Sequence, residues 1–264
     1  MTPGSYYNGF APRDGMPAYP SLWNGCVAAW APCLGPTGLV LRDWSGFANH
    51  GTLTNMDAAS DWVLSGGKYA LDFDGTNDYA SLGTSATFSP SPMSISFWVK
   101  MNSTPAVNDG VFGRMSNTFW NDGYGVFWAS STALRFWMGL YNFRYGQITV
   151  ATPTAWNHVV CEWISGTSPE IYLQGVKGTN NSQTFTTQTA TGADLTLGRM
   201  SDNAYNINGQ LDDLRIYNRV LSGYEKTLLG SRRGIAYDMD LPIWYADQGV
   251  SSAARLRRIL TGVV

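Results

Sequence analysis

Short runs that alternate apolar and small polar residues dominate the chain between residues 22 and 229. In residues 93–100 large apolar side chains alternate with serines, which is the pattern of a β-strand covered on one face. The pattern predicts many short strands rather than helices. Comparable runs occupy residues 69–73, 125–128, 134–138, 148–150, 158–163, 170–174, 194–198 and 210–217.

Turn-forming residues separate these runs. Asp74-Gly75 and the Asn-Asp-Gly triplets at 108–110 and 121–123 are typical of hairpin turns. Many short strands without intervening helical patterns favour an all-β antiparallel sandwich. No equal-period repeat occurs, which argues against a propeller. One short helix is expected over residues 221–229, where Ser222 and Glu225 have the spacing of a capping box.

Two flanks differ from the predicted sandwich, which we place at residues 23–230. Residues 1–22 contain four prolines, each of which lacks an amide donor, so this segment is expected to be an extended N-terminal arm. Its aromatic residues either anchor the arm on a neighbouring surface or fold back on the parent domain. These candidate anchors are Tyr6, Tyr7, Phe10 and Tyr19.

Residues 231–264 form the second flank, a C-terminal extension. Its residues 251–260 place Leu256, Ile259 and Leu260 near one helical face and the arginines mostly on another, which predicts a short amphipathic helix. Ten residues are too few for a stable isolated helix. This helix must therefore dock on a surface or oligomerise.

Composition excludes several classes of protein. The net charge of −2 gives no electrostatic footprint for nucleic acid. No signal peptide is visible at the N-terminus, and no apolar run reaches the roughly 18 residues needed for membrane insertion. Three cysteines, Cys26, Cys33 and Cys161, make neither a disulfide framework nor a zinc motif, although Cys26 and Cys33 could pair.

The order and spacing of several segments resemble the laminin-G-like superfamily. They cover roughly residues 25–230, and the resemblance implies a concanavalin-A-like jelly roll, a sandwich of two curved antiparallel sheets. The segments that carry the resemblance are residues 43–51, 69–82, 93–99, 155–160, 171–175, 195–199 and 209–222.

The flanking segments 22–36 and 231–237 resemble laminin-G-like proteins encoded by tailed bacteriophages. This resemblance implies a non-catalytic virion accessory protein, a head decoration or fibre-like module that assembles in the host cytoplasm. Its arms would bind the capsid or sister subunits, as a homo-oligomer for which we expect a trimer. An odd number of cysteines fits assembly in a reducing compartment.

The same fold also carries glucanases, so a catalytic function has to be weighed. Retaining glycoside hydrolysis needs two carboxyl groups about 5–5.5 Å apart. None of the three glutamates lies in a motif of that kind, and the adjacent Asp212 and Asp213 point to opposite sides of a strand. His50 in a turn and His158 in a framework strand suggest no catalytic triad. We therefore expect no enzymatic activity.

One structural calcium ion is a candidate cofactor. The turn-rich segment 43–51 concentrates oxygen atoms, and Ca²⁺ takes 6–8 oxygen ligands. The resemblance implies that an aspartate of a late strand completes the site. The alternative is that these side chains only cap a turn. The candidate metal residues are Asp43, Ser45, Asn49, His50 and Asp212.

Aromatic residues are densest at 119–128 and 134–145. Tyrosine and tryptophan combine an apolar ring with a polar atom and stack well on sugars or on protein surfaces. For each residue singly, a place in the core is the alternative. The candidates for glycan or protein contact are Trp120, Asn121, Asp122, Tyr124, Trp137, Tyr141, Asn142, Arg144 and Tyr145.

The sequence therefore favours a virion accessory module that displays its sandwich for glycan or host-surface contact. Three alternatives stay open. One is a purely structural capsid cement without glycan binding. The others are a glycoside hydrolase of the same fold and a bacterial adhesion module.

Overall fold

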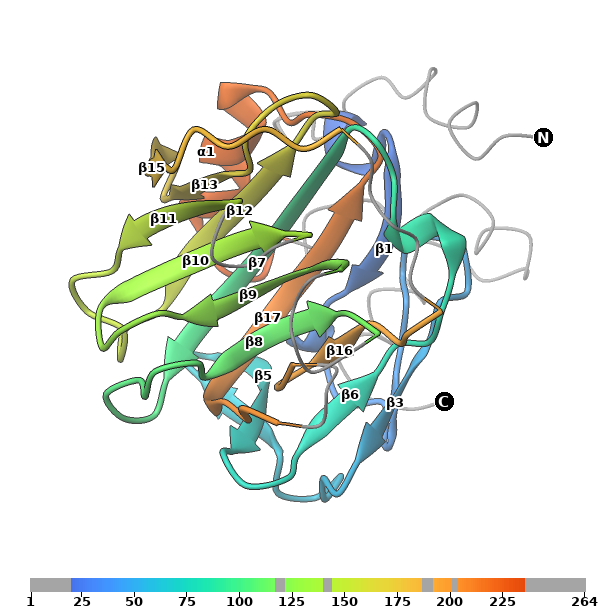
Figure 1. Cartoon of the computed structure of the whole chain (residues 1–264). Coiled ribbons are helices and arrows are strands. Elements are labelled where there is room, and N and C mark those ends of the chain that lie inside the picture. The colour runs from blue at the N-terminus through green and yellow to red at the C-terminus, as the bar shows by residue number, and fades with distance from the viewer. Residues whose placement is uncertain (1–19, 117–121, 140–143, 187–191, 201–203, 236–264) are drawn as a thin grey trace.

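The computed structural model describes residues 20–116, 122–139, 144–186, 192–200 and 204–235. Within this part the chain folds into two antiparallel sheets packed face to face (Figure 1). The predicted all-β sandwich is confirmed. The expected helix at 251–260 lies outside the described residues, as do the candidate arm anchors Tyr6, Tyr7, Phe10 and Tyr19.

The first sheet, here called sheet A, has the strand order β14-β13-β12-β7-β17-β5-β4, and β1 pairs with β17 beside this path. Its longest strands, β7 and β17, lie at its centre and pair with each other. Its strands are β1 (Cys26–Trp30), β4 (Trp62–Ser65), β5 (Lys68–Asp74), β7 (Met93–Met101), β12 (Asn157–Trp163), β13 (Glu170–Leu173), β14 (Val176–Lys177) and β17 (Asn208–Tyr217).

The second sheet, sheet B, has the order β15-β11-β10-β9-β8-β16-β6-β3-β2. The β9–β10–β11 meander lies in front of β7 and β12 in Figure 1. Its strands are β2 (Val40–Leu41), β3 (Gly51–Thr54), β6 (Tyr79–Ser81), β8 (Gly110–Arg114), β9 (Tyr124–Trp128), β10 (Ala133–Met138), β11 (Tyr145–Thr149), β15 (Thr179–Asn180) and β16 (Thr196–Leu197).

The main core fills the space between the two sheets. Alternate residues of β7 and β12 point into it from sheet A, and alternate residues of β9 and β10 from sheet B. Phe97 of β7 meets Phe112 of β8 edge to face, with ring centroids 5.4 Å apart. Because both sheets contribute aromatic rings at alternate positions, the predicted period of two is what builds this layer.

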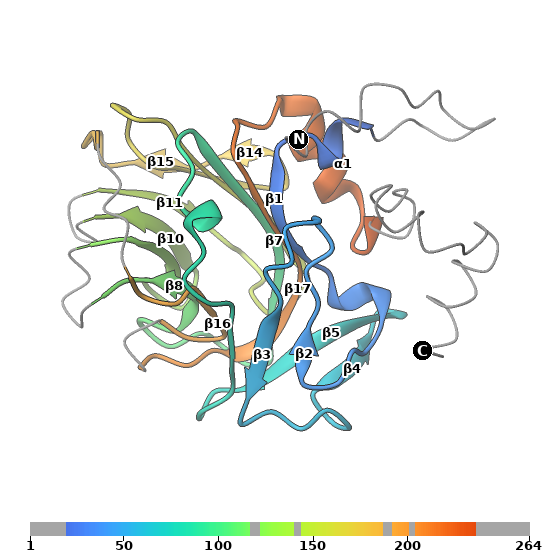
Figure 2. The same ribbon diagram turned by 90° about the vertical axis from the view of Figure 1, so that its right-hand side faces the viewer.

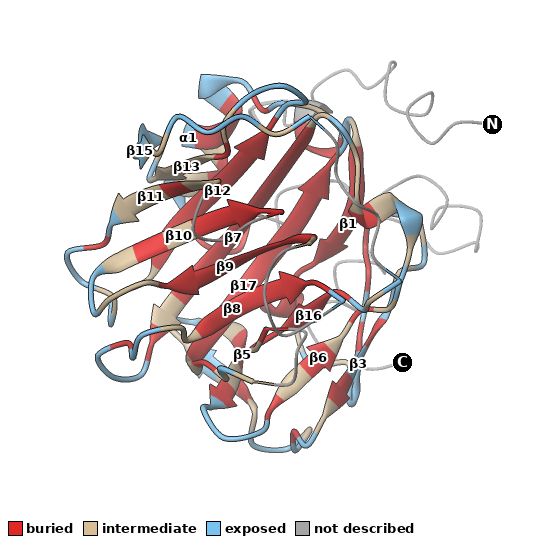
Figure 3. Ribbon diagram, viewed as in Figure 1, coloured by how far each residue is buried: buried red, intermediate tan, exposed pale blue. Residues whose placement is uncertain are grey.

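Sheet A is buried on its outer face as well, which the alternation did not predict. Ser94 and Ser96 of β7, expected on a solvated face, are at most 1% exposed. A second apolar cluster covers them, built from β1, from the short 3-10 helices η2 (Pro20–Trp23) and η3 (Pro32–Leu34), and from helix α1 (Gly223–Ser231). Figure 3 shows buried residues along most of the length of β7 and β17.

Helix α1 is the short helix expected near residues 221–229. Ser222 and Glu225 form the predicted capping box. The helix lies on the side of sheet A that faces away from β8, β10 and β11 (Figure 2). A Cβ on Gly230 would come within 2.8 Å of His158 Nδ1, so glycine allows the helix to approach β12 closely.

Candidate functional site

The outer face of sheet B carries a row of six residues in register across six strands. Cross-strand pairing joins Thr196 to Gly113, Gly113 to Gly125 and Gly125 to Trp137. The two central residues of the row are glycines and therefore have no side chain. The residues on either side of them have polar or amphipathic side chains. The row runs Ser81, Thr196, Gly113, Gly125, Trp137 and Tyr145.

The two glycines create a trough that the side chain of Met200 occupies. A Cβ on Gly125 would lie 2.8 Å from Met200 Cε, and one on Gly113 would lie 3.1 Å from the same atom. Met200 packs there with Met115, Phe127 and Trp137. Glycine within a strand weakens a sheet unless something approaches closely, and here the methionine does.

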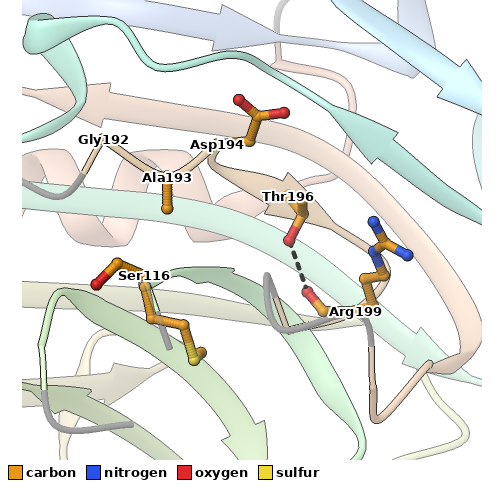
Figure 4. A pocket seen from close by; sticks show the side chains of 7 residues that line it. Ser116, Gly192, Ala193, Asp194, Thr196 and Arg199 are labelled. Atoms are coloured by element: carbon orange, nitrogen blue, oxygen red, sulfur yellow. Dashed lines mark hydrogen bonds between the residues drawn. The ribbon is translucent and has the colours of Figure 1, made fainter. Parts of the chain in front are cut away.

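A pocket of about 380 Å³ opens beside this trough (Figure 4). Ser116, just beyond the end of β8, lies across it from Ala193 and Thr196. Thr196 Oγ1 donates to the carbonyl of Arg199 at 3.1 Å. The described residues that line the pocket are Met115, Ser116, Gly192, Ala193, Asp194, Thr196 and Arg199.

Charged groups frame this pocket without forming an ion pair across it. Asp194 is exposed and accepts a hydrogen bond from Ser81 Oγ at 2.8 Å. The guanidinium of Arg199 lies 3.2 Å from the centroid of the Tyr79 ring. Arg114, 2% exposed, donates to the carbonyl of Ala193 at 3.4 Å and so supports the lining segment. The lining therefore combines the hydroxyl residues Ser116 and Thr196, one carboxylate and one arginine with the apolar Met115 and Ala193.

Asp194 is the single acidic residue among those that line the pocket in the described part of the chain. Cleavage of a glycosidic bond by a retaining or inverting route needs two carboxyl groups on either side of the bond. The groups present can donate and accept hydrogen bonds with sugar hydroxyls. Asp194 supplies the one carboxyl group of the described lining, and the Asp122 carboxyl contacts this lining through Ser116.

Other carboxylates are buried in ion pairs on the outer face of sheet A. Glu162 Oε2 lies 2.6 Å from Lys226 Nζ, and Asp213 Oδ1 lies 2.7 Å from Arg215 Nε. Asp212 pairs with Arg233 at 2.8 Å. Burial, reinforced by the charge of Asp213, raises the pKa of Asp212 to about 7 although Arg233 opposes the shift. A raised pKa often marks an active site, but Asp212 is 1% exposed and out of a substrate's reach.

The candidate calcium turn is held by its own hydrogen bonds. Asp43 Oδ1 accepts from the amides of Ala29 and Ser45, both at 2.9 Å. Asp43 Oδ2 accepts from Ser45 Oγ at 2.8 Å and from the amide of Asn49 at 2.9 Å. Four donors occupy the acceptor positions of one carboxylate. This is the turn-capping alternative.

The remaining candidate ligands are also engaged. His50 Nδ1 accepts from the Asp43 amide at 3.1 Å, and Asp212 accepts from the Cys33 amide at 2.9 Å besides Arg233. Asp43, Ser45, Asn49 and His50 thus lie in one turn, whereas Asp212 belongs to a different set of contacts. No cluster of three metal-binding side chains occurs in the described part. Calcium stays a prediction, and these contacts do not support the inclusion of Asp212.

Five of the candidate glycan contacts fall in the described ranges. Tyr124 and Trp137 are fully buried, and the Tyr124 hydroxyl donates to the carbonyl of Phe88 at 2.6 Å. Their prediction as contact residues is wrong because Tyr124 lies in the core between the sheets and Trp137 is buried in the cluster with Met200 on the outer face of sheet B. The other four candidates, Trp120, Asn121, Tyr141 and Asn142, lie outside the described residues.

Asp122, Arg144 and Tyr145 are partly exposed but do not meet at one site. Asp122 Oδ1 accepts from the Ser116 amide at 3.0 Å. Arg144 immediately precedes β11, and Tyr145 is the first residue of that strand. Arg144 stacks on Phe185 at 4.8 Å, and Tyr145 lies under the guanidinium of Arg135 at 4.2 Å. Only Asp122 is next to the pocket, through its contact with Ser116.

Sequence reasoning missed the residues that line the pocket. Ser116 and the segment 192–199 are far apart in the chain, and neither contains a recognisable motif. One signal was available. Gly113 and Gly125 each interrupt a strand pattern, and glycine in a strand marks a close approach of another group.

All three cysteines lie in the described part of the chain. Cys26, Cys33 and Cys161 are buried and form no disulfide bond in the described part of the chain, so the optional Cys26–Cys33 pairing is not made. Burial raises the pKa of the Cys26 thiol to about 12. In the described ranges, no helix combines the length and the apolar character that crossing a bilayer requires.

Two curved antiparallel sheets around an aromatic core define a lectin-type sandwich. Residues 74–225 match the sequence profile of the family described as the concanavalin A-like lectin/glucanases superfamily. The match spans more than half of the chain, and the protein belongs to this family. No curated protein matches the sequence significantly.

Solved structures share this fold at low sequence identity. Domain 4 of AbnA, a GH43 extracellular arabinanase from Geobacillus stearothermophilus in complex with arabinotriose, matches at TM-score 0.61 and 20% identity, over 78% of this chain and 98% of that domain. A Trypanosoma rangeli sialidase matches at TM-score 0.60 and 16% identity, over 80% of this chain but 33% of the sialidase. The binding domain of Paraclostridial Mosquitocidal Protein 1 matches at 0.58 and 16%, over 79% and 52%. These similarities establish the fold.

Proposed function

We propose that the protein is a non-catalytic glycan-binding module. The observation that carries the proposal is the pocket on the outer face of sheet B, whose lining combines hydroxyl, carboxylate and arginine side chains with apolar ones. Sugar rings combine hydroxyl edges with apolar faces and suit such a lining. The arabinanase domain, which shares this fold, is in complex with arabinotriose, and this supports the proposal.

Isothermal titration of the full chain with arabinotriose and with β-glucan oligosaccharides tests the proposal, after a glycan array has selected the best ligand. Asp194→Asn and Arg199→Gln are expected to weaken binding about tenfold each, since one hydrogen bond to a charged group contributes about 1.5 kcal/mol. Lys177→Gln, an exposed cation on β14, is the matched control and is expected to bind as the unaltered protein does. Silence of the array, or equal affinity of all three variants, would overturn the proposal.

A second measurement on the same ligands tests for hydrolysis. We expect no release of reducing ends from β-glucans during prolonged incubation, because the pocket lining offers one carboxylate. Release of reducing ends that disappears in Asp194→Asn would instead show an enzyme. The glycoside hydrolase alternative would then replace the binding module.

We further propose that the module is a virion accessory protein, attached to a capsid or to sister subunits through its terminal segments 1–19 and 236–264. The resemblance of segments 22–36 and 231–237 to phage-encoded proteins supports this role, as does the amphipathic pattern at 251–260. Sedimentation with capsid shells that lack the protein tests attachment, and light scattering tests the expected trimer. Attachment together with a silent glycan array would favour the purely structural cement.

A further inference from the structure

Two arginines of sheet B lie over tyrosine rings. The guanidinium of Arg199 is 3.2 Å from the ring centroid of Tyr79, and that of Arg135 is 4.2 Å from the ring centroid of Tyr145. Contact with an aromatic face restrains the plane of a guanidinium and leaves the N–H groups along its edges to donate hydrogen bonds. Both pairs therefore hold an arginine in a restrained orientation.

The two arginines differ in the acceptors of their hydrogen bonds. Arg135 Nε donates to Gln147 Oε1 at 2.6 Å, and Gln147 is directly opposite on the neighbouring strand β11. Within the described ranges no residue accepts a hydrogen bond from the Arg199 guanidinium, and its Nε is enclosed without an acceptor. Polar groups at such positions almost always have a partner. Arg199 therefore lacks the acceptor that Gln147 provides for Arg135.

Arg199 belongs to the lining of the pocket on sheet B, and its side chain is half-buried. The acidic residue of the described lining, Asp194, lies on the other side of Thr196 (Figure 4). Asp194 Oδ2 accepts from Ser81 Oγ at 2.8 Å, so this carboxylate is directed to β6 and does not neutralise Arg199. The missing acceptor can come from a ligand in the pocket.

We propose that the pocket binds an acidic sugar, a uronic acid residue whose carboxylate pairs with the Arg199 guanidinium; this inference rests on the proposed glycan-binding function. The two parallel donors of a guanidinium match the two oxygens of a carboxylate. Because Tyr79 restrains Arg199 before the ligand arrives, less side-chain freedom is lost on binding. Asp194, beyond Thr196, accepts from ring hydroxyls of the same ligand.

Isothermal titration of the full chain with trigalacturonic acid and with its methyl ester tests the proposal, because esterification removes the charge and retains the sugar backbone. We expect the acid to bind about tenfold more tightly than the ester at low salt, since hydrogen bonds between charged groups are the stronger ones. Arg199→Gln is expected to abolish this preference. Arg135→Gln is the matched control and is expected to retain it, because the Arg135 guanidinium already has Gln147 as its partner.

Arg199→Lys is a second variant, which keeps the positive charge without the paired donors. We expect it to show a preference for the acid between those of the unaltered protein and of Arg199→Gln. Circular dichroism of each variant confirms that its fold is intact before the affinities are compared.

Equal affinity for the acid and the ester, while the glycan array shows binding, would overturn the acidic-sugar assignment and leave the glycan-binding function in place. A preference for the acid that persists in Arg199→Gln would overturn the role of Arg199. Tighter binding of a sulfated galactotriose than of trigalacturonic acid would replace the carboxylate by a sulfate ester. An array without any bound glycan would contradict the proposed function itself.

Discussion

The outer faces of the two sheets differ in how far the rest of the chain covers them. The outer face of sheet A carries charged and hydroxyl side chains, yet they are buried beneath α1 and η3 and paired within the chain. The outer face of sheet B has glycines at the centre of its row, one methionine laid over them, and an open pocket at its side. The first face is closed by the chain itself, and the second leaves groups available to a ligand.

This contrast shows why polarity alone does not identify a binding face. Asp212, Asp213, Glu162 and His158 have the chemistry of an active site, but their partners are internal. Buried charges require such partners because desolvation without them is expensive. Exposed groups with few internal partners are the ones that can meet a sugar.

Removal of one buried cation should have the largest effect. Arg215→Met leaves the Asp213 carboxylate buried without its bidentate partner, so we expect the free energy of unfolding to fall by about 3–5 kcal/mol. Arg135→Met on the outer face of sheet B, where the arginine is partly exposed, should cost less than about 1 kcal/mol. Urea titration of both variants measures the difference, and equal losses would contradict the contrast.

Acidification should lower the free energy of unfolding, because His158 is buried on the outer face of sheet A. Burial, together with the nearby positive charge of Arg215, lowers the pKa of His158 to about 3. The unfolded chain then binds more protons below pH 6.5, so stability is lost as pH falls. From pH 7 to pH 5 the loss is about 2 kcal/mol, which His158→Gln should abolish.

Urea midpoints of both proteins at the two pH values provide the measurement. The raised pKa of Asp212 acts in the other direction, because its folded form holds a proton more readily, but it is present in both proteins and cancels in their difference. Identical pH dependence of the two proteins would show that His158 is accessible to protons.

Filling the trough on sheet B should have a moderate effect. In Gly125→Ala the added carbon would lie 2.8 Å from Met200 Cε and 2.9 Å from the carbonyl oxygen of Phe112, so we expect a loss of roughly 1–2 kcal/mol. Gly192→Ala meets nothing within 4 Å and serves as the matched control. Thermal unfolding compares them. Full stability of Gly125→Ala would mean that Met200 does not occupy the trough.

Removal of divalent metal should have the smallest effect. The Asp43 carboxylate already accepts four hydrogen bonds, one of them from β1 of the closed face. We therefore expect EDTA to leave Tm unchanged. A lower Tm that calcium restores and zinc does not would reinstate the calcium site.

Local pattern predicted the elements of this fold well. The alternation at 93–100 and 158–163 became β7 and β12, and the spacing of Ser222 and Glu225 became the cap of α1. The pattern was misleading on the outer face of sheet A, which α1 and the second apolar cluster cover. Ser94 and His158 have the polarity of solvated positions but lie beneath α1.

Candidate site residues were predicted less well than strands. The chemistry of Tyr124 and Trp137 predicts ligand contacts, but both side chains are buried and cannot make them. The pocket instead joins Ser116 to Asp194, which are 78 residues apart in number and meet because β16 pairs with β8. No local feature of either segment predicts that the two lie side by side.

The sequence by itself determined the period-two strands, the turns and the capped helix, because these depend on neighbouring residues and on the backbone preferences of glycine, proline and aspartate. Only the tertiary structure decided which polar side chains are enclosed and which remain open. That outcome depends on the order of strands in each sheet and on the helix that packs behind one of them, and both are set by contacts between residues distant in the chain.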